Sequence, residues 1–343
     1  FAWQGGEPTL MGLDFFRRAV ELQKRYALSD LRITNALQTN GTRLTPEWGP
    51  FLRDEGFLVG ISIDGPAELH DRYRRDARGR GSLERALRGL EVLQQHQVAF
   101  NTLTCVQRKN GDHPQRVYRF LRGLGSRHMQ FIPIVEHSSE RGVSRRSVHP
   151  RQFGRFLNGV FDAWRGRDIG HVFVQHFDMM LGIVLGLPAS LCVHTERCGR
   201  HVAMEHNGDV FNCDHFVDPP HLLGNLMETP LRELLDCAEA DRFGARKREG
   251  LPRYCLRCRH LPYCHGGCPA HRFDKAPGGE PGLNHLCEGY RLFYRHTLPH
   301  FEAMAASLRS GRSAGEYAQF AAGGELASAT ESPVSRNAAC PCG

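Results

Sequence analysis

The sequence predicts an α/β protein whose first half forms a parallel sheet or barrel and whose second half contains a smaller, cysteine-rich domain. Two observations support the first part: short apolar runs alternate with amphipathic helical patterns, and polar, glycine-containing segments follow successive runs. A third observation supports the second part, because nine of the twelve cysteines lie between residues 192 and 287. At 343 residues, the chain is long enough for one large α/β unit with an appended domain.

The expected elements of the first half follow from hydrophobic periodicity. Residues 31–37, 58–63, 99–106 and 129–135 are apolar or β-branched runs bounded by turn residues, which predicts strands. Residues 15–26, 82–95 and 117–124 repeat apolar side chains on one helical face, and Ser82 is the expected N-cap of the second of these helices. Further helices are expected at about 152–164 and 177–186. This alternation predicts βαβ units.

Three polar segments follow the expected strands at residues 4–8, 38–41 and 62–66. Each of them alone is an ordinary turn more often than a binding site. In a parallel α/β fold, however, the carboxyl ends of the strands meet at one edge, where ligands collect. Three such segments after successive strands therefore predict one shared ligand-binding rim.

The cysteines of the second half have the number and spacing of metal ligands. They form a C-x5-C-x14-C group from Cys192 to Cys213, a C-x2-C-x5-C-x3-C group from Cys255 to Cys268, and the single Cys287. Asn207-Gly208 predicts a hairpin that folds Cys213 back toward Cys198. Eight thiolates suit two four-cysteine sites, and both zinc and iron–sulfur clusters fit such ligands. Disulfides fit less well in a chain with this apolar content. Cys105 and Cys237 are expected to be buried thiols.

Composition excludes some classes of protein. No apolar run approaches the roughly 20 residues that span a bilayer. The net charge is +7, and arginines crowd residues 72–80, but aromatic side chains are scarce there, so a solvated loop is favoured over nucleic-acid binding. No signal peptide is visible, although the chain begins with Phe1.

Taken together, the residues resemble the radical S-adenosylmethionine (SAM) enzymes with a SPASM-type auxiliary domain, and more narrowly the anaerobic sulfatase-maturating enzymes. The matching segments occur in the family's order over about residues 1–300. They are WQGGEPTL from Trp3, LQTNGT from Leu37, LVGISIDGP from Leu58, QFIP from Gln130, Cys213-Asp214, LGNL from Leu223 and CHGGC from Cys264.

The resemblance implies a partial (β/α)6 radical SAM barrel followed by an iron–sulfur domain. The expected division is a barrel over residues 1–150, a helical connection over 151–191, a SPASM-type domain over 192–300 and a flexible tail over 301–343. Ser335 to Gly343 resemble the opening of a SEC-C-type zinc motif, of which only Cys340 and Cys342 are present.

The resemblance also implies the site residues. Those expected to contact SAM are Gln4, Gly5, Gly6, Glu7, Asn40 and Ser62. The first cysteine set, expected to hold one auxiliary [4Fe-4S] cluster, is Cys192, Cys198, Cys213 and Cys268. The second cysteine set, expected to hold another, is Cys255, Cys258, Cys264 and Cys287. Asp214 matches the family's proton-accepting aspartate. A hydrogen-bonding turn residue is the alternative interpretation of Asp214.

The implied activity is the radical oxidation of a cysteine or serine in a sulfatase polypeptide to Cα-formylglycine. A cytosolic one-electron donor of the flavodoxin or ferredoxin type would be needed, and oxygen-sensitive clusters suggest a cytoplasmic location. Two alternatives stay open: a SPASM maturase that modifies another ribosomal peptide, and a zinc-stabilised binding module without catalysis.

The sequence departs from the family pattern at its beginning. The C-x3-C-x2-C motif that holds the SAM-binding cluster does not occur in the 343 residues. In the family it precedes the QGGEP segment, so we expect the ligands of a third [4Fe-4S] cluster to lie upstream of Phe1. We therefore expect this chain alone to be inactive as an oxidoreductase.

Overall fold

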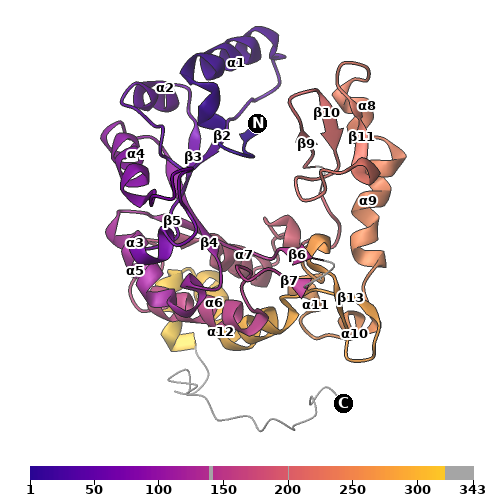
Figure 1. Ribbon diagram of the computed structural model, residues 1–343. Coiled ribbons are helices and arrows are strands. Elements are labelled where there is room, and N and C mark those ends of the chain that lie inside the picture. Colours follow the sequence, from indigo (N-terminus) through magenta and orange to yellow (C-terminus); the bar gives the residue numbers. More distant parts are fainter. Residues whose placement is uncertain (139–141, 200, 321–343) are drawn as a thin grey trace.

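The computed structural model describes residues 1–138, 142–199 and 201–320. Six parallel strands form its main sheet in the order β1-β2-β3-β4-β5-β8 (Figure 1). These strands are β1 (Ala2–Trp3), β2 (Ala36–Thr39), β3 (Leu58–Ser62), β4 (Phe100–Val106), β5 (His128–Pro133) and β8 (Phe173–Val174). Because the spatial order follows the chain order, each crossover places a strand beside its predecessor. The expected α/β class with a parallel sheet is confirmed.

Helices lie between these strands and after the last one. They are α1 (Leu13–Tyr26), α2 (Trp48–Asp54), α3 (Ala67–His70), α4 (Leu83–Gln95), α5 (Pro114–Gly123), α6 (Pro150–Arg165) and α7 (Gln175–Val184), with the 3-10 turns η1 (Pro8–Met11) and η2 (Asn110–Asp112). Figure 1 shows α1, α2 and α4 along one face of the sheet. The three helical patterns of the first half correspond to α1, α4 and α5.

The strand expected over residues 31–37 is wrong at its beginning. β2 starts only at Ala36, while Leu31 is exposed and its backbone N–H bonds to the carbonyl of Leu28 in a turn. Pairing begins where both neighbours are available, since Ala36 lies opposite Ala2 in β1 and Leu58 in β3. Strand residues need partners, which local sequence does not reveal.

The N-cap of α4 lies at Ser82 as expected, but the Ser82 side chain does not cap the helix. Instead, the Asp71 Oδ1 atom accepts hydrogen bonds from the backbone N–H groups of Ser82 at 2.8 Å and Leu83 at 2.9 Å. The first turn of the helix is thus satisfied by a residue eleven positions earlier in the chain.

The second half consists mostly of short elements. They are β6 (His137–Ser138), β7 (Gly142–Val143), η3 (Cys192–His194), β9 (Ala203–Met204), β10 (Asp209–Phe211), η4 (Pro219–His221), β11 (Leu222–Asn225), α8 (Leu231–Leu235), α9 (Ala238–Glu249), α10 (Arg253–Leu256), α11 (Leu261–Cys264), η5 (Pro269–His271), β12 (Asp274–Lys275), β13 (Pro281–Leu283), α12 (Cys287–Arg309) and η6 (Ala314–Phe320). The expected hairpin at Asn207-Gly208 is confirmed, because β9 and β10 pair antiparallel around it.

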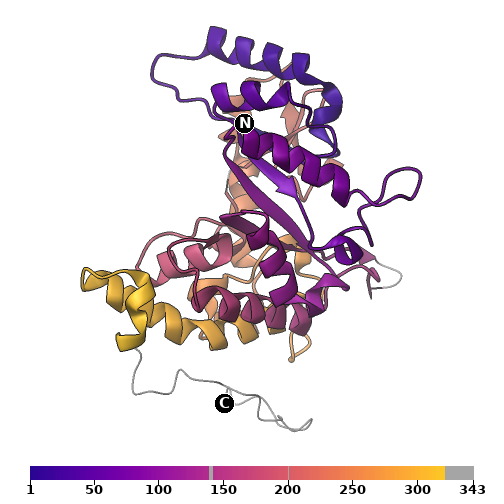
Figure 2. The same cartoon turned by 90° about the vertical axis from the view of Figure 1, so that its left-hand side faces the viewer.

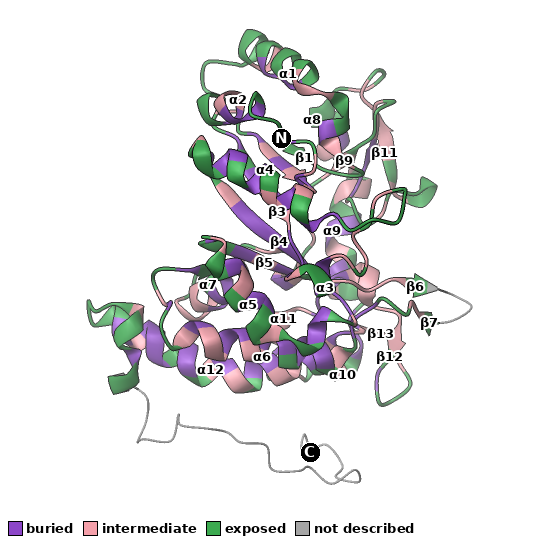
Figure 3. Ribbon diagram, turned by 60° about the vertical axis from the view of Figure 1, so that its left-hand side comes forward, coloured by how far each residue is buried: buried purple, intermediate pink, exposed green. Residues whose placement is uncertain are grey.

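The long helix α12 joins the two halves. It packs lengthwise on α6, and buried aromatic side chains of both helices belong to the same hydrophobic core, among them Phe153 and Phe161 of α6 and Tyr290 and Phe301 of α12. Buried residues are concentrated along β3, β4, α6 and α12 in Figure 3. The cysteine-rich half is therefore anchored to the main sheet through helices.

The flexible tail expected from residue 301 is wrong for its first part. Helix α12 continues to Arg309, and η6 packs back on the core through the buried Tyr317. The alanine- and glycine-rich composition of this segment did not predict the apolar contact of Tyr317. The SEC-C-like end with Cys340 and Cys342 lies outside the described residues.

The first strand and the last described helix lie at opposite ends of the molecule (Figure 2). None of the helices formed by the described residues has the length and apolar character needed to cross a membrane.

Candidate functional site

A cavity of about 470 Å³ opens at the carboxyl edge of the sheet. Its wall includes Asn40 after β2, Asp64 after β3, Cys105 at the end of β4 and Ile134 after β5, together with Arg74 from the loop between α3 and α4. Parallel α/β folds collect ligands at this edge. The cavity thus lies along the rim at the second and third polar segments, whereas none of residues 4–8, including Gln4, Gly5, Gly6 and Glu7, is among the described residues of its wall.

The Glu7 carboxylate ties the first rim segment to the second. One of its oxygens accepts a hydrogen bond from the Thr39 hydroxyl, and the other accepts one from the Asn40 backbone N–H, both at 2.7 Å. Gly5 and Gly6 turn the chain with φ values of +91° and +52°, which glycine adopts without strain. Because both Glu7 oxygens are engaged by the chain itself, Glu7 shapes the rim.

The two other rim residues implied by the resemblance occupy different positions. Asn40 lines the cavity, and its side-chain oxygen accepts from the backbone N–H and hydroxyl of Thr42 at 2.9 and 2.7 Å. Ser62 is the half-buried last residue of β3 and is not among the described residues that line the cavity. The structure therefore brings Asn40, but not Ser62, into the cavity wall.

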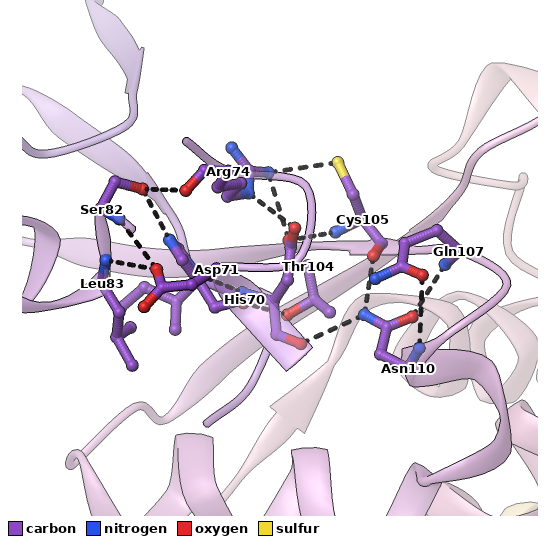
Figure 4. Close-up of polar contacts among 11 residues, drawn as sticks. His70, Asp71, Arg74, Ser82, Leu83, Thr104, Cys105, Gln107 and Asn110 are labelled. Atoms are coloured by element: carbon purple, nitrogen blue, oxygen red, sulfur yellow. Dashed lines mark hydrogen bonds and ion pairs between the residues drawn. The ribbon is translucent and has the colours of Figure 1, made fainter. Parts of the chain in front are cut away.

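A buried ion pair that the sequence interpretation missed stands in the same wall (Figure 4). Arg74 Nε donates to Asp64 Oδ2 at 2.6 Å, while Asp64 Oδ1 accepts from the Cys105 backbone N–H at 2.9 Å. The Asp64 side chain is only 3% exposed. Arg74 belongs to the stretch that we expected to be solvated, and its pairing corrects that expectation. Cys105, expected to be a buried thiol, is only partly buried.

His70 holds the loop that carries Arg74. Its Nδ1 atom accepts from the Asp64 backbone N–H at 3.2 Å, so the ring proton lies on Nε2, which is 3.1 Å from the Ser82 hydroxyl. That hydroxyl donates in turn to the Arg74 carbonyl at 3.0 Å. Burial lowers the pKa of His70 to about 4. A neutral imidazole therefore fixes this side of the cavity.

A hydrogen bond connects the rim to the cysteine-rich half. Gln4 Nε2 donates to Asp214 Oδ2 at 3.0 Å, although the two residues are 210 positions apart. The other carboxylate oxygen, Oδ1, accepts from the Cys213 thiol at 3.2 Å. The structure thus brings together a rim residue, the expected proton acceptor and a cysteine of the first set.

Cysteines of the first set are close enough to influence one another's ionisation. Burial raises the pKa of Cys268 to about 11, and charge on Cys192 and Cys198 adds to this shift. Burial likewise raises the pKa of Cys213 to about 12, with contributions from Asp214 and Cys268. Buried thiols of this kind become thiolates when a metal supplies the opposing charge.

The second set surrounds one cavity. All four of its cysteines line this space, together with the aromatic rings of Tyr290 and Tyr294. Burial raises the pKa of Cys264 to about 11 and that of Cys287 to about 12, and the other cysteines of the set reinforce both shifts. Four thiols that line one cavity have the chemistry of a four-cysteine cluster, although no three metal-ligating side chains among the described residues are grouped closely enough to hold a single metal ion.

Comparison with known proteins explains this combination. Residues 1–121 match the model of the radical SAM superfamily, and residues 192–259 match that of the SPASM iron–sulfur cluster-binding domain. A serine-type anaerobic sulfatase-maturating enzyme of Bacteroides thetaiotaomicron is 39% identical over 323 residues, which cover 90% of this chain and 78% of the relative. This chain belongs to the anaerobic sulfatase-maturating enzymes.

Two further matches agree with that membership. A cysteine-type anaerobic sulfatase-maturating enzyme of Clostridium novyi is 31% identical to this maturase over 90% of the chain and 83% of the relative. The solved structure of native anSMEcpe with bound AdoMet and Cp18Cys peptide superposes with a TM-score of 0.83, at 32% identity, over 90% of this chain and 86% of that chain. The maturase is therefore a radical SAM oxidoreductase with a SPASM domain, and SAM and [4Fe-4S] clusters are its cofactors.

Sequence reasoning missed other polar residues around the site. Besides Asp64, Arg74 and His70, these are Lys247 of α9 and Arg272 after η5, both of which face cysteines. Asp64 could have been noticed, since it lies in the third rim segment. The burial of Lys247 could not be predicted from the sequence. Its helix has the composition of a solvent-exposed helix, with four other charged residues in its last turns.

Proposed function

We propose that this maturase oxidises a serine or cysteine side chain of a sulfatase polypeptide to Cα-formylglycine. The observation that carries the proposal is the Gln4–Asp214 hydrogen bond, since it sets a carboxylate between the rim of the barrel and a cysteine of the first set. A substrate bound at the rim would have the proton acceptor Asp214 and the proposed electron-accepting cluster of the first set on the same side of its target side chain.

The rim residues would hold SAM at the carboxyl edge of the sheet. The turn of Gln4, Gly5 and Gly6, whose shape Glu7 fixes, would face its methionine end, with Asn40 beside it and Ser62 at the end of β3. With a reduced cluster, bound SAM supplies a carbon-centred radical that removes a hydrogen atom from the target Cβ. The rim residues position and shield that reaction.

Asp214 would accept the proton that leaves the oxidised substrate. Its Oδ1 accepts from the Cys213 thiol in this structure, but a cysteine that ligates a metal is a thiolate and has no proton to donate. Cluster binding would therefore release Oδ1 as an acceptor while Gln4 keeps Oδ2 in position. Such a positioned carboxylate is suited to general-base catalysis.

We further propose two auxiliary [4Fe-4S] clusters, one on each cysteine set. The first set contains Cys213, next to Asp214, and would take the electron released by the substrate. The second set is enclosed by α10, α11 and the start of α12, and would pass the electron onward. A cytosolic flavodoxin- or ferredoxin-type protein is the proposed electron donor, in accordance with a cytoplasmic location.

The proposed division of the chain follows these roles. Residues 1–150 would form the barrel, 151–191 the helical connection and 192–300 the cluster domain. The extent of the two family matches, 1–121 and 192–259, supports this division. α12 extends past the proposed end of the cluster domain and packs on α6 of the connection.

The test compares Asp214→Asn with Asp218→Asn, a carboxylate four residues away whose ion pair is with His221. Both are made in a chain extended by the family's C-x3-C-x2-C segment and supplied with SAM, a reductant and sulfatase peptides. Asp214→Asn should lower formylglycine production about 10²- to 10⁴-fold while 5′-deoxyadenosine still forms. Asp218→Asn should match the parent.

Full product formation by Asp214→Asn would overturn the role of this carboxylate. Paired serine and cysteine peptides in the same assay identify the preferred target. The higher identity to the serine-type relative, 39% against 31%, favours serine.

A further inference from the structure

Lys247 is a buried cation inside the cluster half. It lies near the end of α9, its residue is 1% exposed, and its Nζ atom donates to the Cys192 carbonyl at 2.5 Å. Within residues 1–138, 142–199 and 201–320, Lys247 forms no ion pair with an aspartate or glutamate. The helix thus carries a charge into the interior that no carboxylate of the described chain balances.

The groups that face this ammonium are cysteines of the first set. Burial lowers the pKa of Lys247, whereas negative charge on Cys198, Cys192 and Cys268 would raise it. Arg272 is a second cation nearby and also lowers the pKa of Lys247. An unpaired buried charge is costly, so an anion beside these groups would stabilise the arrangement.

The positive charge of Arg272 is balanced in a different way. Its guanidinium donates to the backbone carbonyls of Gly266, Lys247 and His265 at 2.9, 2.6 and 2.8 Å, which shares its charge with peptide dipoles. It faces cysteines of both sets. Of the cysteines, Lys247 instead faces those of the first set, while the rings of His194 and His265 also lie near it. A thiolate-ligated cluster in that set is the anion that would balance it.

We propose that Lys247 is a positioning residue that raises the reduction potential of the cluster held by the first set, and so makes this cluster the electron acceptor of the reaction. The inference rests on the proposed function. After its Cβ hydrogen is removed, the substrate radical gives one electron to the oxidised cluster and one proton to Asp214, which leaves a carbonyl or thiocarbonyl. Reduction adds one negative charge beside Lys247, and a fixed positive charge in a poorly screened interior stabilises that state.

The test compares Lys247→Met with Arg248→Met. Arg248 is the next residue of the same helix, but its side chain is 41% exposed and lies 3.3 Å from Glu196, so its variant removes the same charge from a solvated position. Both chains are reconstituted with iron and sulfide under anaerobic conditions. Their clusters are then titrated against potential and followed by electron paramagnetic resonance.

A Cys198→Ser variant assigns the signal of the first set. In Lys247→Met, the equilibrium constant for reduction of this cluster should fall at least about tenfold, which is 59 mV for a one-electron couple. Arg248→Met should leave it nearly unchanged, because a solvated charge is screened. Lys247→Arg, which keeps the charge, should restore most of the potential. The second cluster should shift much less in every variant.

An unchanged potential in a fully loaded Lys247→Met chain would overturn the proposal. If that variant holds no cluster in the first set, the reduction potential is measured on Lys247→Gln instead. The glutamine amide can still donate to the Cys192 carbonyl but carries no charge. Loss of the first cluster in both variants would mean that Lys247 serves assembly and would overturn the redox role. A parent chain that binds no iron would instead contradict the proposed function itself.

Discussion

Several single residues of this maturase have roles that depend on burial. Arg74 lies in a run of arginines typical of a solvated loop, yet it pairs with the nearly inaccessible carboxylate of Asp64 and lines the cavity. Removing one partner of such a pair leaves an uncompensated charge in the interior, which makes both residues necessary for the shape of the cavity wall. The surface arginines Arg78 and Arg80 of the same run lie instead around Asp76.

His70 predicts acid sensitivity of the barrel. Its folded-state pKa of about 4 lies below the ordinary value of about 6.5. Between these two pH values, His70 is therefore protonated in the unfolded chain but neutral in the folded chain. The contribution of His70 to stability, about 3 kcal/mol from this difference, is therefore complete above pH about 6.5 and is lost as the pH falls toward about 4. Urea unfolding across this range measures the loss.

A His70→Asn variant provides the comparison. It can still accept from the Asp64 backbone N–H but does not titrate, so its unfolding free energy should be lower at neutral pH and depend less steeply on acid. If both proteins show the same slope between about pH 6.5 and 4, His70 is not the residue responsible.

At the scale of elements, two helices determine the position of Cys287, the last cysteine of the second set. α6 and α12 cross at glycines: a Cβ atom on Gly289 would lie 2.1 Å from the Pro150 carbonyl oxygen, and one on Gly154 would lie 2.5 Å from that of Gly289. Cys287 is the first residue of α12, only two positions before this contact. The close crossing therefore positions a cysteine that we propose as a cluster ligand.

Gly289→Ala should push these helices apart. The expected cost is about 1–3 kcal/mol of unfolding free energy, as for other overpacked cores, with less iron bound by the second set. Chemical denaturation and iron analysis measure the two effects. Gly123→Ala in α5 is the matched control, because a Cβ there meets nothing within 4 Å, and it should be neutral or slightly stabilising. Equal behaviour of the two variants would contradict this explanation.

On the scale of the whole molecule, the two halves differ in what stabilises them. The barrel and the α6–α12 pair share one hydrophobic core, whereas residues 192–285 consist mainly of elements of two to five residues around the cysteines. In such a region, metal binding contributes folding free energy directly. Lys247 and Arg272 would also lose the negative charge that they face.

Removing iron with a chelator should therefore loosen the cluster half first. Amide hydrogen exchange should accelerate in η3, β9, β10 and α9, while β3, β4 and α6 stay protected. Uniform acceleration throughout the chain would contradict this division and indicate one cooperative unit.

Local signals in the sequence determined a large part of this architecture. Hydrophobic periodicity predicted the strands and helices of the sheet, and Asn207-Gly208 predicted the hairpin, because both depend on backbone preferences of neighbouring residues. The spacing of the cysteines predicted metal ligation. Their division into two sets came from family resemblance, and Cys264 and Cys287 of the second set do face one cavity.

Which distant residues meet depends on the packing of the whole chain. The contact between Gln4 and Asp214 spans 210 positions, and the direction in which Lys247 points depends on how α9 lies against η3. Burial and long-range pairing are properties of the packed chain, so no window of neighbouring residues contains them. The sequence by itself therefore determined the elements and the chemical groups of this maturase, whereas packing decided which charges are buried beside which cysteines.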